Sequence, residues 1–283
     1  TAASRMLATN SLERACCGCL REEIAGFACR SWKAPECEWR NAMNPSHSRS
    51  THLRAQTFPE PSMNTLTNAP LADLLQRLFA EAEASAPGDS PALADLSEAE
   101  LKRLMGSKTE YREFYGRLKD LALPVSRETG CLLYMLARSS SARSIVEFGT
   151  SFGLSTLHLA AALRDNGGGR LIGSEFEPSK AERARRNLAA GGLLDLVELR
   201  EGDALQTLAK DLPDSIDLVL LDGAKALYPE VLALLESRLR PGALVIADNA
   251  EHSPEYLAHV RSPANGYLST PFAEDVELSM RLG

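Results

Sequence analysis

Two short motifs combine carboxylate, amide and amine groups in a way that suits chemistry at an oxygen atom. Asp222 and Lys225 follow one apolar run of the chain, and Asp248 and Asn249 follow the next. Carboxylate and amide oxygens are the ligands that Mg²⁺ prefers, and neither motif contains the histidine or cysteine typical of zinc sites. A partly desolvated lysine beside such a cation can lose its proton and act as a base. The alternative is that Lys225 is a solvated cation of a loop, paired with Asp222.

A glycine turn precedes these motifs. The apolar run 145–148 is followed by Gly149 and Gly153, and a helical pattern begins at Leu154. A strand, a glycine turn and a helix N-terminus form a nucleotide-binding arrangement. A dinucleotide fingerprint requires another glycine two positions after Gly149, where Ser151 stands instead. The residues of this stretch that we expect to contact a cofactor are Glu147, Gly149, Thr150, Ser151, Gly153 and Ser155.

Acidic residues also end the neighbouring apolar runs. Glu175 ends the second run and can accept hydrogen bonds from ribose hydroxyls, and Phe176 can pack on an adenine ring. Glu177 competes for the first role, but its place near a helix start makes capping the simpler interpretation. Asp203, followed by Ala204, ends the third run, where it could also be an N-cap. Ligands of doubly wound sheets lie beyond the C-terminal strand ends, so we expect these residues at one site.

The elements that position these residues alternate between strands and helices. We expect strands at 145–148, 170–174, 196–200, 216–221 and 243–247, with a closing hairpin at 267–271 and 276–281. We expect helices at 154–164, 178–190, 203–212, 228–239 and 254–261. Repeated strand–helix units predict a Rossmann-like, doubly wound α/β sheet of seven mostly parallel strands, in which the C-terminal hairpin is antiparallel.

The chain before the first strand divides into two parts. From Asn68, a plausible N-cap, apolar residues recur at helical spacing, and further helices are expected at 97–105, 110–121 and 126–137. Residues 63–140 are therefore predicted to form a helical layer, and residues 141–283 the catalytic domain. Residues 1–62 lack aspartate and hold both tryptophans. We expect them to be a disordered or non-native extension, with a basic arm or an organelle-targeting peptide as the alternative.

Composition excludes some classes of function. The net charge of −7 argues against a nucleic-acid backbone as the main partner, and no stretch approaches the roughly 20 apolar residues that span a bilayer. A cytoplasmic protein without a membrane partner is the default expectation. Five of the six cysteines crowd residues 1–62, but no second cysteine pair has zinc-site spacing.

The motifs together resemble a known enzyme family. The pattern acidic-x-Gly-x-x-x-Gly around Gly149 resembles the first motif of class I S-adenosylmethionine-dependent methyltransferases. The set Asp222, Lys225, Tyr228 and Asp248-Asn249 resembles the metal-dependent O-methyltransferases, the group of catechol and caffeoyl-CoA O-methyltransferases. The resemblance covers roughly residues 70–283.

This resemblance implies roles for particular residues and partners. Asp222, Asp248 and Asn249 would hold Mg²⁺ or another divalent cation, Lys225 would be catalytic, and Asp222 would also contact S-adenosylmethionine. Asp203 would meet the adenine amino group. The acceptor would be a small catechol-like or phenolic molecule. The N-terminal helices would cover the cofactor and could pair two chains into a homodimer.

Departures from the family and competing functions qualify this interpretation. Catechol-methylating relatives have an aromatic residue just before the lysine, where this chain has Ala224, which leaves the acceptor open. His252 either lines the pocket or is a surface residue, and His158 is expected to pack inside a helix. The alternatives are a metal-independent methyltransferase, a nicotinamide-dependent oxidoreductase and a non-catalytic module that binds S-adenosylmethionine.

Overall fold

A computed structural model describes residues 64–85, 91–272 and 275–283 of the chain. The predicted extension 1–62 lies outside these residues. Within the described segments, no helix is both long enough and apolar enough to cross a membrane.

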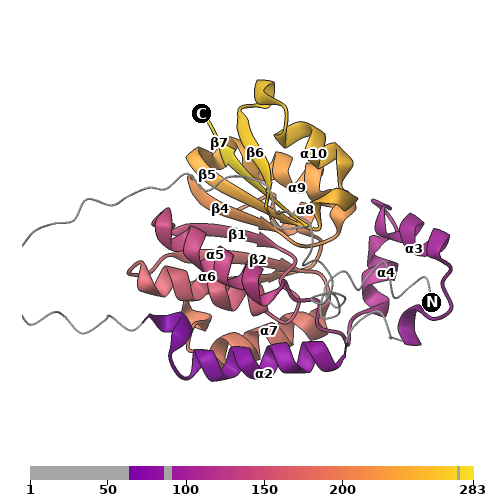
Figure 1. Ribbon diagram of the computed structural model, residues 1–283, viewed down its shortest axis with the longest axis horizontal. Helices are drawn as coiled ribbons and strands as arrows, with labels where there is room; N and C mark the ends of the chain where they lie inside the picture. Colours follow the sequence, from indigo (N-terminus) through magenta and orange to yellow (C-terminus); the bar gives the residue numbers. More distant parts are fainter. Residues whose placement is uncertain (1–63, 86–90, 273–274) are drawn as a thin grey trace, which may run out of the picture. The chain divides into compact units, whose positions relative to one another are not determined.

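A seven-stranded sheet organises the described residues (Figure 1). Its strands lie in the order β3-β2-β1-β4-β5-β7-β6. The first five are parallel, and β7 is antiparallel to both β5 and β6. The order reverses between β1 and β4, the point at which doubly wound sheets bind ligands. The predicted fold class is confirmed. The strands are β1 (Ser144–Phe148), β2 (Arg170–Glu175), β3 (Val197–Glu201), β4 (Ile216–Leu221), β5 (Leu239–Asp248), β6 (Tyr267–Phe272) and β7 (Val276–Arg281).

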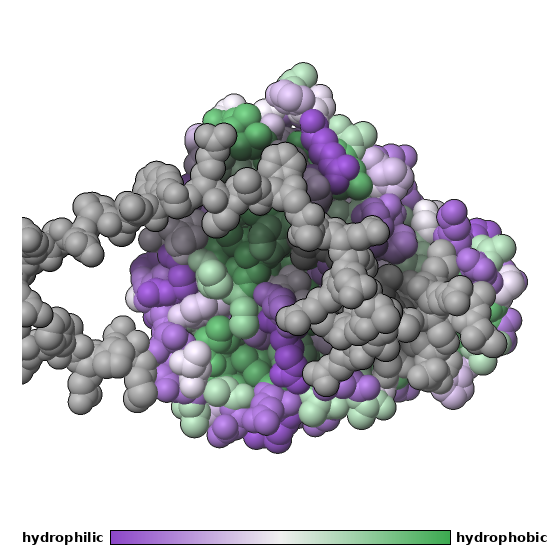
Figure 2. Space-filling model, viewed as in Figure 1, coloured by the Kyte–Doolittle hydropathy of each residue, from purple (hydrophilic) through white to green (hydrophobic). Residues whose placement is uncertain are grey.

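Helices cover both faces of the sheet (Figure 1). On one face lie α2 (Leu71–Ala84), α5 (Arg127–Ser139), α6 (Leu154–Asp165) and α7 (Pro178–Ala190). On the other lie α8 (Ala204–Thr207), α9 (Tyr228–Leu235) and α10 (Pro254–Val260). Two short helices, α3 (Glu98–Met105) and α4 (Tyr111–Arg117), share a small apolar cluster of their own. On the face seen in Figure 2, hydrophilic residues predominate around the margin and hydrophobic ones gather towards the middle.

The apolar strands bury side chains on both faces because successive residues point to opposite sides. In β1, Ile145 packs with the helices of the first face and Val146 with those of the second. In β4, Leu218 belongs to the first cluster and Val219 to the second. This two-sided burial holds the C-terminal strand ends in fixed register, so the residues that follow them are held by a rigid frame.

Several predicted boundaries were wrong. Asn68 is not the N-cap of α2, which begins at Leu71 after Pro70. The helix predicted at 110–121 ends at Arg117, well before Pro124. The helix predicted at 228–239 is also shorter, because α9 ends at Leu235. The strand predicted at 243–247 begins earlier, at Leu239, so that Pro241 lies inside β5, where the pairing with β4 shifts register. A β-bulge of this kind accommodates a proline in a sheet.

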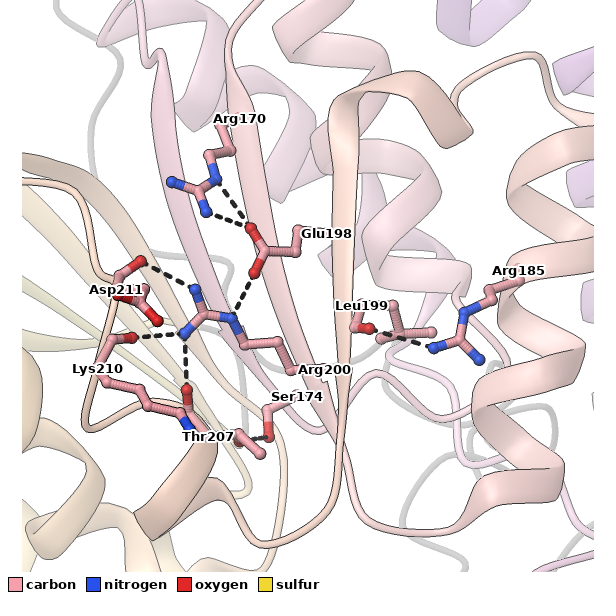
Figure 3. A network of polar contacts seen from close by, with 9 residues as sticks. All are labelled: Arg170, Ser174, Arg185, Glu198, Leu199, Arg200, Thr207, Lys210 and Asp211. Atoms are coloured by element: carbon pink, nitrogen blue, oxygen red, sulfur yellow. Dashed lines mark hydrogen bonds and ion pairs between the residues drawn. The ribbon is translucent and has the colours of Figure 1, made fainter.

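The helix predicted at 203–212 is also shorter, because α8 ends at Thr207. The guanidinium of Arg200 on β3 donates to the carbonyl oxygens of Thr207 (2.6 Å), Lys210 (2.7 Å) and Asp211 (2.9 Å), as Figure 3 shows. Glu198 accepts from Arg200 Nε at 2.7 Å and also pairs with Arg170. These bonds supply donors to backbone carbonyl groups at the end of α8 and in the segment after it, where the helix does not continue.

Candidate functional site

A pocket that opens to solvent lies at the C-terminal edge of the sheet. Of the predicted cofactor residues, six line it: Gly149, Ser151, Glu175, Phe176, Ala204 and Asp222. The cap helix α4 adds Tyr111 and Tyr115. The sequence thus predicted the floor of the pocket, formed by the turns after the parallel strands.

The glycine turn after β1 requires a residue without a side chain. Gly149 has a φ of +96°, and a Cβ added there would lie 2.5 Å from the carbonyl oxygen of Asp222 and from the backbone nitrogen of Gly223. The turn is also tied to β2, because the N–H groups of Gly149 and Thr150 both donate to the carbonyl oxygen of Ser174. Close approach of three strand ends therefore depends on Gly149.

Glu147 anchors this turn from behind. Its side chain is completely buried and accepts hydrogen bonds from the hydroxyls of Thr150 (3.0 Å), Ser155 (2.7 Å) and Thr156 (2.6 Å). Burial raises the pKa of Glu147, and the three hydroxyl bonds oppose this. The structure thus places Glu147, predicted to contact the cofactor, beneath the turn that would do so. Gly153, at φ +87°, is the N-cap residue before α6.

Glu175 faces the pocket from the end of β2. Its Oε2 accepts the N–H of Ser151 at 2.7 Å, and its Oε1 accepts the N–H of Glu177 at 2.9 Å. Burial raises its pKa, while these hydrogen bonds and the charge of Lys180 act to lower it. A carboxylate has about four lone-pair sites, so Glu175 retains capacity for hydroxyl donors such as those of a ribose. The side chain of Glu177 caps α7 through Ser179, as predicted.

The helix α4 closes over the adjoining wall of the pocket. The Tyr111 ring meets Phe176 edge to face, with centroids 6.3 Å apart. Arg112 Nη2 lies 2.7 Å from Asp203 Oδ2, and Asp203 also caps α8 through the N–H of Leu205. Asp203 is therefore both the predicted N-cap and the point where the cap helix attaches. Tyr111 and Arg112 were not predicted as site residues, because helical spacing does not indicate which distant strand end a helix face contacts.

The second predicted cluster joins the ends of β4 and β5. Lys225 Nζ lies 2.9 Å from Asp222 Oδ1 and 3.7 Å from Asp248 Oδ2, and all three side chains are nearly buried. The hydroxyl of Tyr228 donates to the carbonyl oxygen of Asp248 at 2.8 Å. Lys225 is thus paired with Asp222, as in the alternative interpretation, but it is buried rather than solvated.

The charges of this cluster are tightly coupled. Burial raises the pKa of Asp222 and of Asp248, and Asp222 raises that of Asp248 further. Burial acts to lower the pKa of Lys225, but Tyr228, Asp222 and Asp248 outweigh it and hold that pKa well above its usual value. Two buried carboxylates with one ammonium leave an excess of negative charge, which a bound cation would offset.

Asn249 continues the cluster in a left-handed conformation, at φ 47°. Its amide nitrogen donates to Asp275 Oδ2 at 3.3 Å, and the N–H of Ala250 donates to the Asp275 carbonyl at 3.1 Å. A carboxylate only accepts hydrogen bonds, so this contact leaves the amide oxygen of Asn249 available elsewhere. The sequence analysis missed Asp275, which has no motif around it.

The donor set fits a hard cation in its chemistry. Asp222, Asp248 and Asn249 offer two carboxylates and one amide oxygen, as Mg²⁺ prefers. Across the segments that the structure describes, there is no metal-binding group made of three or more histidine, cysteine, aspartate or glutamate side chains. His252 pairs with Glu251 at 3.4 Å and does not line the pocket, and His158 is buried inside α6 as expected.

Comparisons with known proteins agree with this architecture. A family model described as a methyltransferase domain matches residues 146–250. The catechol O-methyltransferase of Niastella koreensis is 37% identical over 57% of this chain and 77% of its own length. Catechol O-methyltransferase B of Danio rerio is 33% identical over 58% of this chain and 64% of its own length.

Solved structures give the same result. The O-methyltransferase TomG of Streptomyces achromogenes, involved in tomaymycin synthesis and crystallised with SAM, is 29% identical to this chain, with a TM-score of 0.50. The superposition covers 68% of this chain and 94% of TomG.

Proposed function

The chain belongs to the class I S-adenosylmethionine-dependent O-methyltransferases, and we propose that it methylates a hydroxyl of a small catechol-like or phenolic acceptor with the help of a divalent cation. The observation that carries this proposal is the buried cluster of Asp222, Lys225 and Asp248, which adjoins the pocket through Asp222. A merely structural ion pair needs one carboxylate, whereas this lysine has two.

Asp222, Asp248 and Asn249 are the residues that would hold the cation. A cation there would lower the pKa of an acceptor hydroxyl and orient it. The cofactor supplies an electrophilic methyl group on its sulfonium. Every remaining requirement falls on side chains of this chain: binding the cofactor at Glu175, excluding water under α4, and holding the acceptor in line with the methyl group.

Lys225 is the group placed to take the acceptor's proton. Its burial favours the neutral amine, while the two carboxylates favour the ammonium. A cation held by Asp222 and Asp248 would balance their negative charge, so that burial would dominate and the Lys225 amine could act as a base. Lys225, Asp222 and Asp248 therefore act together, and substitution of either the lysine or the aspartates should remove most of the rate of methyl transfer.

The acceptor class is supported by the relatives and by the pocket wall. The two curated relatives above are catechol O-methyltransferases. Ala224 lines the pocket next to Lys225 with a methyl group instead of a large ring. This widens the mouth, so we expect bulkier phenolic acceptors to be accepted as well as catechol.

The test has a binding arm and a turnover arm. We would titrate S-adenosylhomocysteine calorimetrically, measure Mn²⁺ affinity, and follow methyl transfer to a panel of catechols with and without EDTA. We expect Asp248→Ala to abolish Mn²⁺ binding and turnover, while Asp195→Ala, which removes an exposed ion pair, leaves both intact. Turnover that persists in EDTA would refute the role of the cation and favour the metal-independent alternative. Cofactor binding without transfer to any acceptor would favour the non-catalytic alternative.

A further inference from the structure

A buried lysine that belongs to no motif lies in the cofactor pocket. Lys180 is in the first turn of α7, shortly after Glu175 ends β2. Its relative exposure is 4%, and it lines the pocket together with Glu175 and Ser151. Lysine is almost never fully buried unless its charge is paired. A buried ammonium at this place therefore needs a partner.

The described side chains satisfy only part of the hydrogen-bonding capacity of the Lys180 ammonium. Among the described residues, the Lys180 ammonium has one hydrogen bond, 3.5 Å long, to the hydroxyl of Ser151, and no ion pair. Its Nζ also lies over the face of the Phe152 ring, 5.6 Å from the centroid, a contact that supplies no hydrogen-bond acceptor atom. An ammonium has three N–H donors. At least two of them thus remain without an acceptor in a site where burial already lowers the pKa of this lysine, with Glu175 opposing.

Ser151 connects this donor to the acid on the other side. Its backbone N–H binds the Glu175 carboxylate at 2.7 Å, while its hydroxyl lies beside the Lys180 ammonium. An acceptor group and a donor group consequently flank one residue of the glycine turn. A vicinal diol matches this pair, because each hydroxyl both donates and accepts hydrogen bonds.

We propose that Lys180 binds the ribose of S-adenosylmethionine, donating to a hydroxyl oxygen while Glu175 accepts the hydroxyl protons. The proposal rests on the cofactor of the proposed function. The methyl group must lie near Lys225 and Asp222, at the end of β4. The ribose then lies two strands further along the sheet, past β1, where Glu175 ends β2 and Lys180 follows in α7.

Three ligands separate this contact from its alternatives. We would measure Kd values of wild type and Lys180→Met for S-adenosylhomocysteine, for 5′-methylthioadenosine, which lacks the amino acid, and for 2′,3′-dideoxy-5′-methylthioadenosine. Lys180→Met should weaken the first two by about tenfold, the loss of one hydrogen bond to a charged group. It should leave the dideoxy ligand's Kd unchanged, because the hydroxyls that Lys180 binds are absent.

Controls keep a folding defect from imitating the result. Lys180→Arg keeps the charge and should recover part of the affinity, and Arg186→Met removes an exposed cation of the same helix and should change no Kd. Thermal unfolding of each variant reports whether it folds. In the wild type alone, the Kd of 2′,3′-dideoxy-5′-methylthioadenosine should be more than tenfold higher than that of 5′-methylthioadenosine. This comparison tests the ribose contacts without any variant.

Two outcomes overturn the proposal. Weaker binding of S-adenosylhomocysteine with unchanged 5′-methylthioadenosine would mean that Lys180 binds the cofactor's carboxylate. Equal weakening of all three ligands would mean that it only supports the pocket. These measurements use neither metal nor acceptor, so a failure of the metal-dependent methylation would leave them interpretable.

Discussion

Replacing Gly149 by alanine tests whether the glycine turn is as tightly packed as the structure shows. At φ +96°, any L side chain is strained, at a cost of about 1–2 kcal/mol. The new Cβ would also lie about 2.5 Å from backbone atoms of Asp222 and Gly223, which cannot rotate away. Overpacking of this kind costs about 1–3 kcal/mol. We expect Gly149→Ala to lose about 2–5 kcal/mol of unfolding free energy in total.

Gly168→Ala is the matched control. Its φ of +103° imposes similar strain, but a Cβ there meets nothing within 4 Å. It should lose only the strain of about 1–2 kcal/mol. For a domain of this size, the expected decreases in melting temperature are about 10 °C for Gly149→Ala and about 4 °C for Gly168→Ala.

Urea denaturation and calorimetric titration with S-adenosylhomocysteine measure both consequences. Because the clash displaces the backbone of Asp222 in the pocket wall, Gly149→Ala should also weaken binding of S-adenosylhomocysteine. The expected increase in Kd is about tenfold, equivalent to 1.4 kcal/mol. Gly168→Ala, in a distant turn, should bind it normally. Equal stability losses in the two variants, with unchanged cofactor affinity in both, would refute the close packing between the turns of β1 and β4.

Three further predictions concern hydrogen bonds behind the site. Thr156→Val removes a 2.6 Å hydrogen bond to buried Glu147 and should lower the unfolding free energy, measured by urea denaturation, by about 1.5–3 kcal/mol. The control Ser139→Ala, at an exposed hydroxyl, should change it by less than about 0.5 kcal/mol. Equal effects of the two variants would contradict the anchoring role of Glu147. Asp275→Ala frees the Asn249 amide and should weaken Mn²⁺ binding by about tenfold; unchanged affinity would exclude this support. Asp165 accepts from Thr65 and Tyr134, and although burial acts to raise its pKa, these bonds hold it below the usual 3.8. A depressed carboxyl pKa stabilises the fold above about pH 4 and loses this effect as the pH falls through the folded pKa, so the melting temperature of Asp165→Asn should fall below wild type at pH 7 and converge with it towards pH 2; a constant difference would rule out this linkage.

The local spacing of residues in the sequence determined the fold class and the floor of the site. Apolar runs alternating with helical periodicity specify strand–helix units, and right-handed connections then place all parallel strand ends at one edge. For this reason Gly149, Glu175 and Asp222 could be assigned to one pocket before any coordinates. Element ends were less well predicted, because tertiary bonds such as those of Arg200 decide where α8 stops.

Only the tertiary structure decided which distant side chains complete the site. Tyr111 of the cap helix and Asp203 are 92 residues apart in the sequence and meet through long-range packing. Lys180 carries no motif, and its position in the amphipathic helix α7 is compatible with solvent exposure or burial. Whether Lys180 is exposed or buried depends on the orientation of α7 about its axis as it packs on the sheet. That orientation is set by the burial of the whole apolar face of the helix and not by any local pattern. The sequence by itself therefore determined at which edge of the sheet the pocket lies, and packing between remote segments determined which side chains surround it.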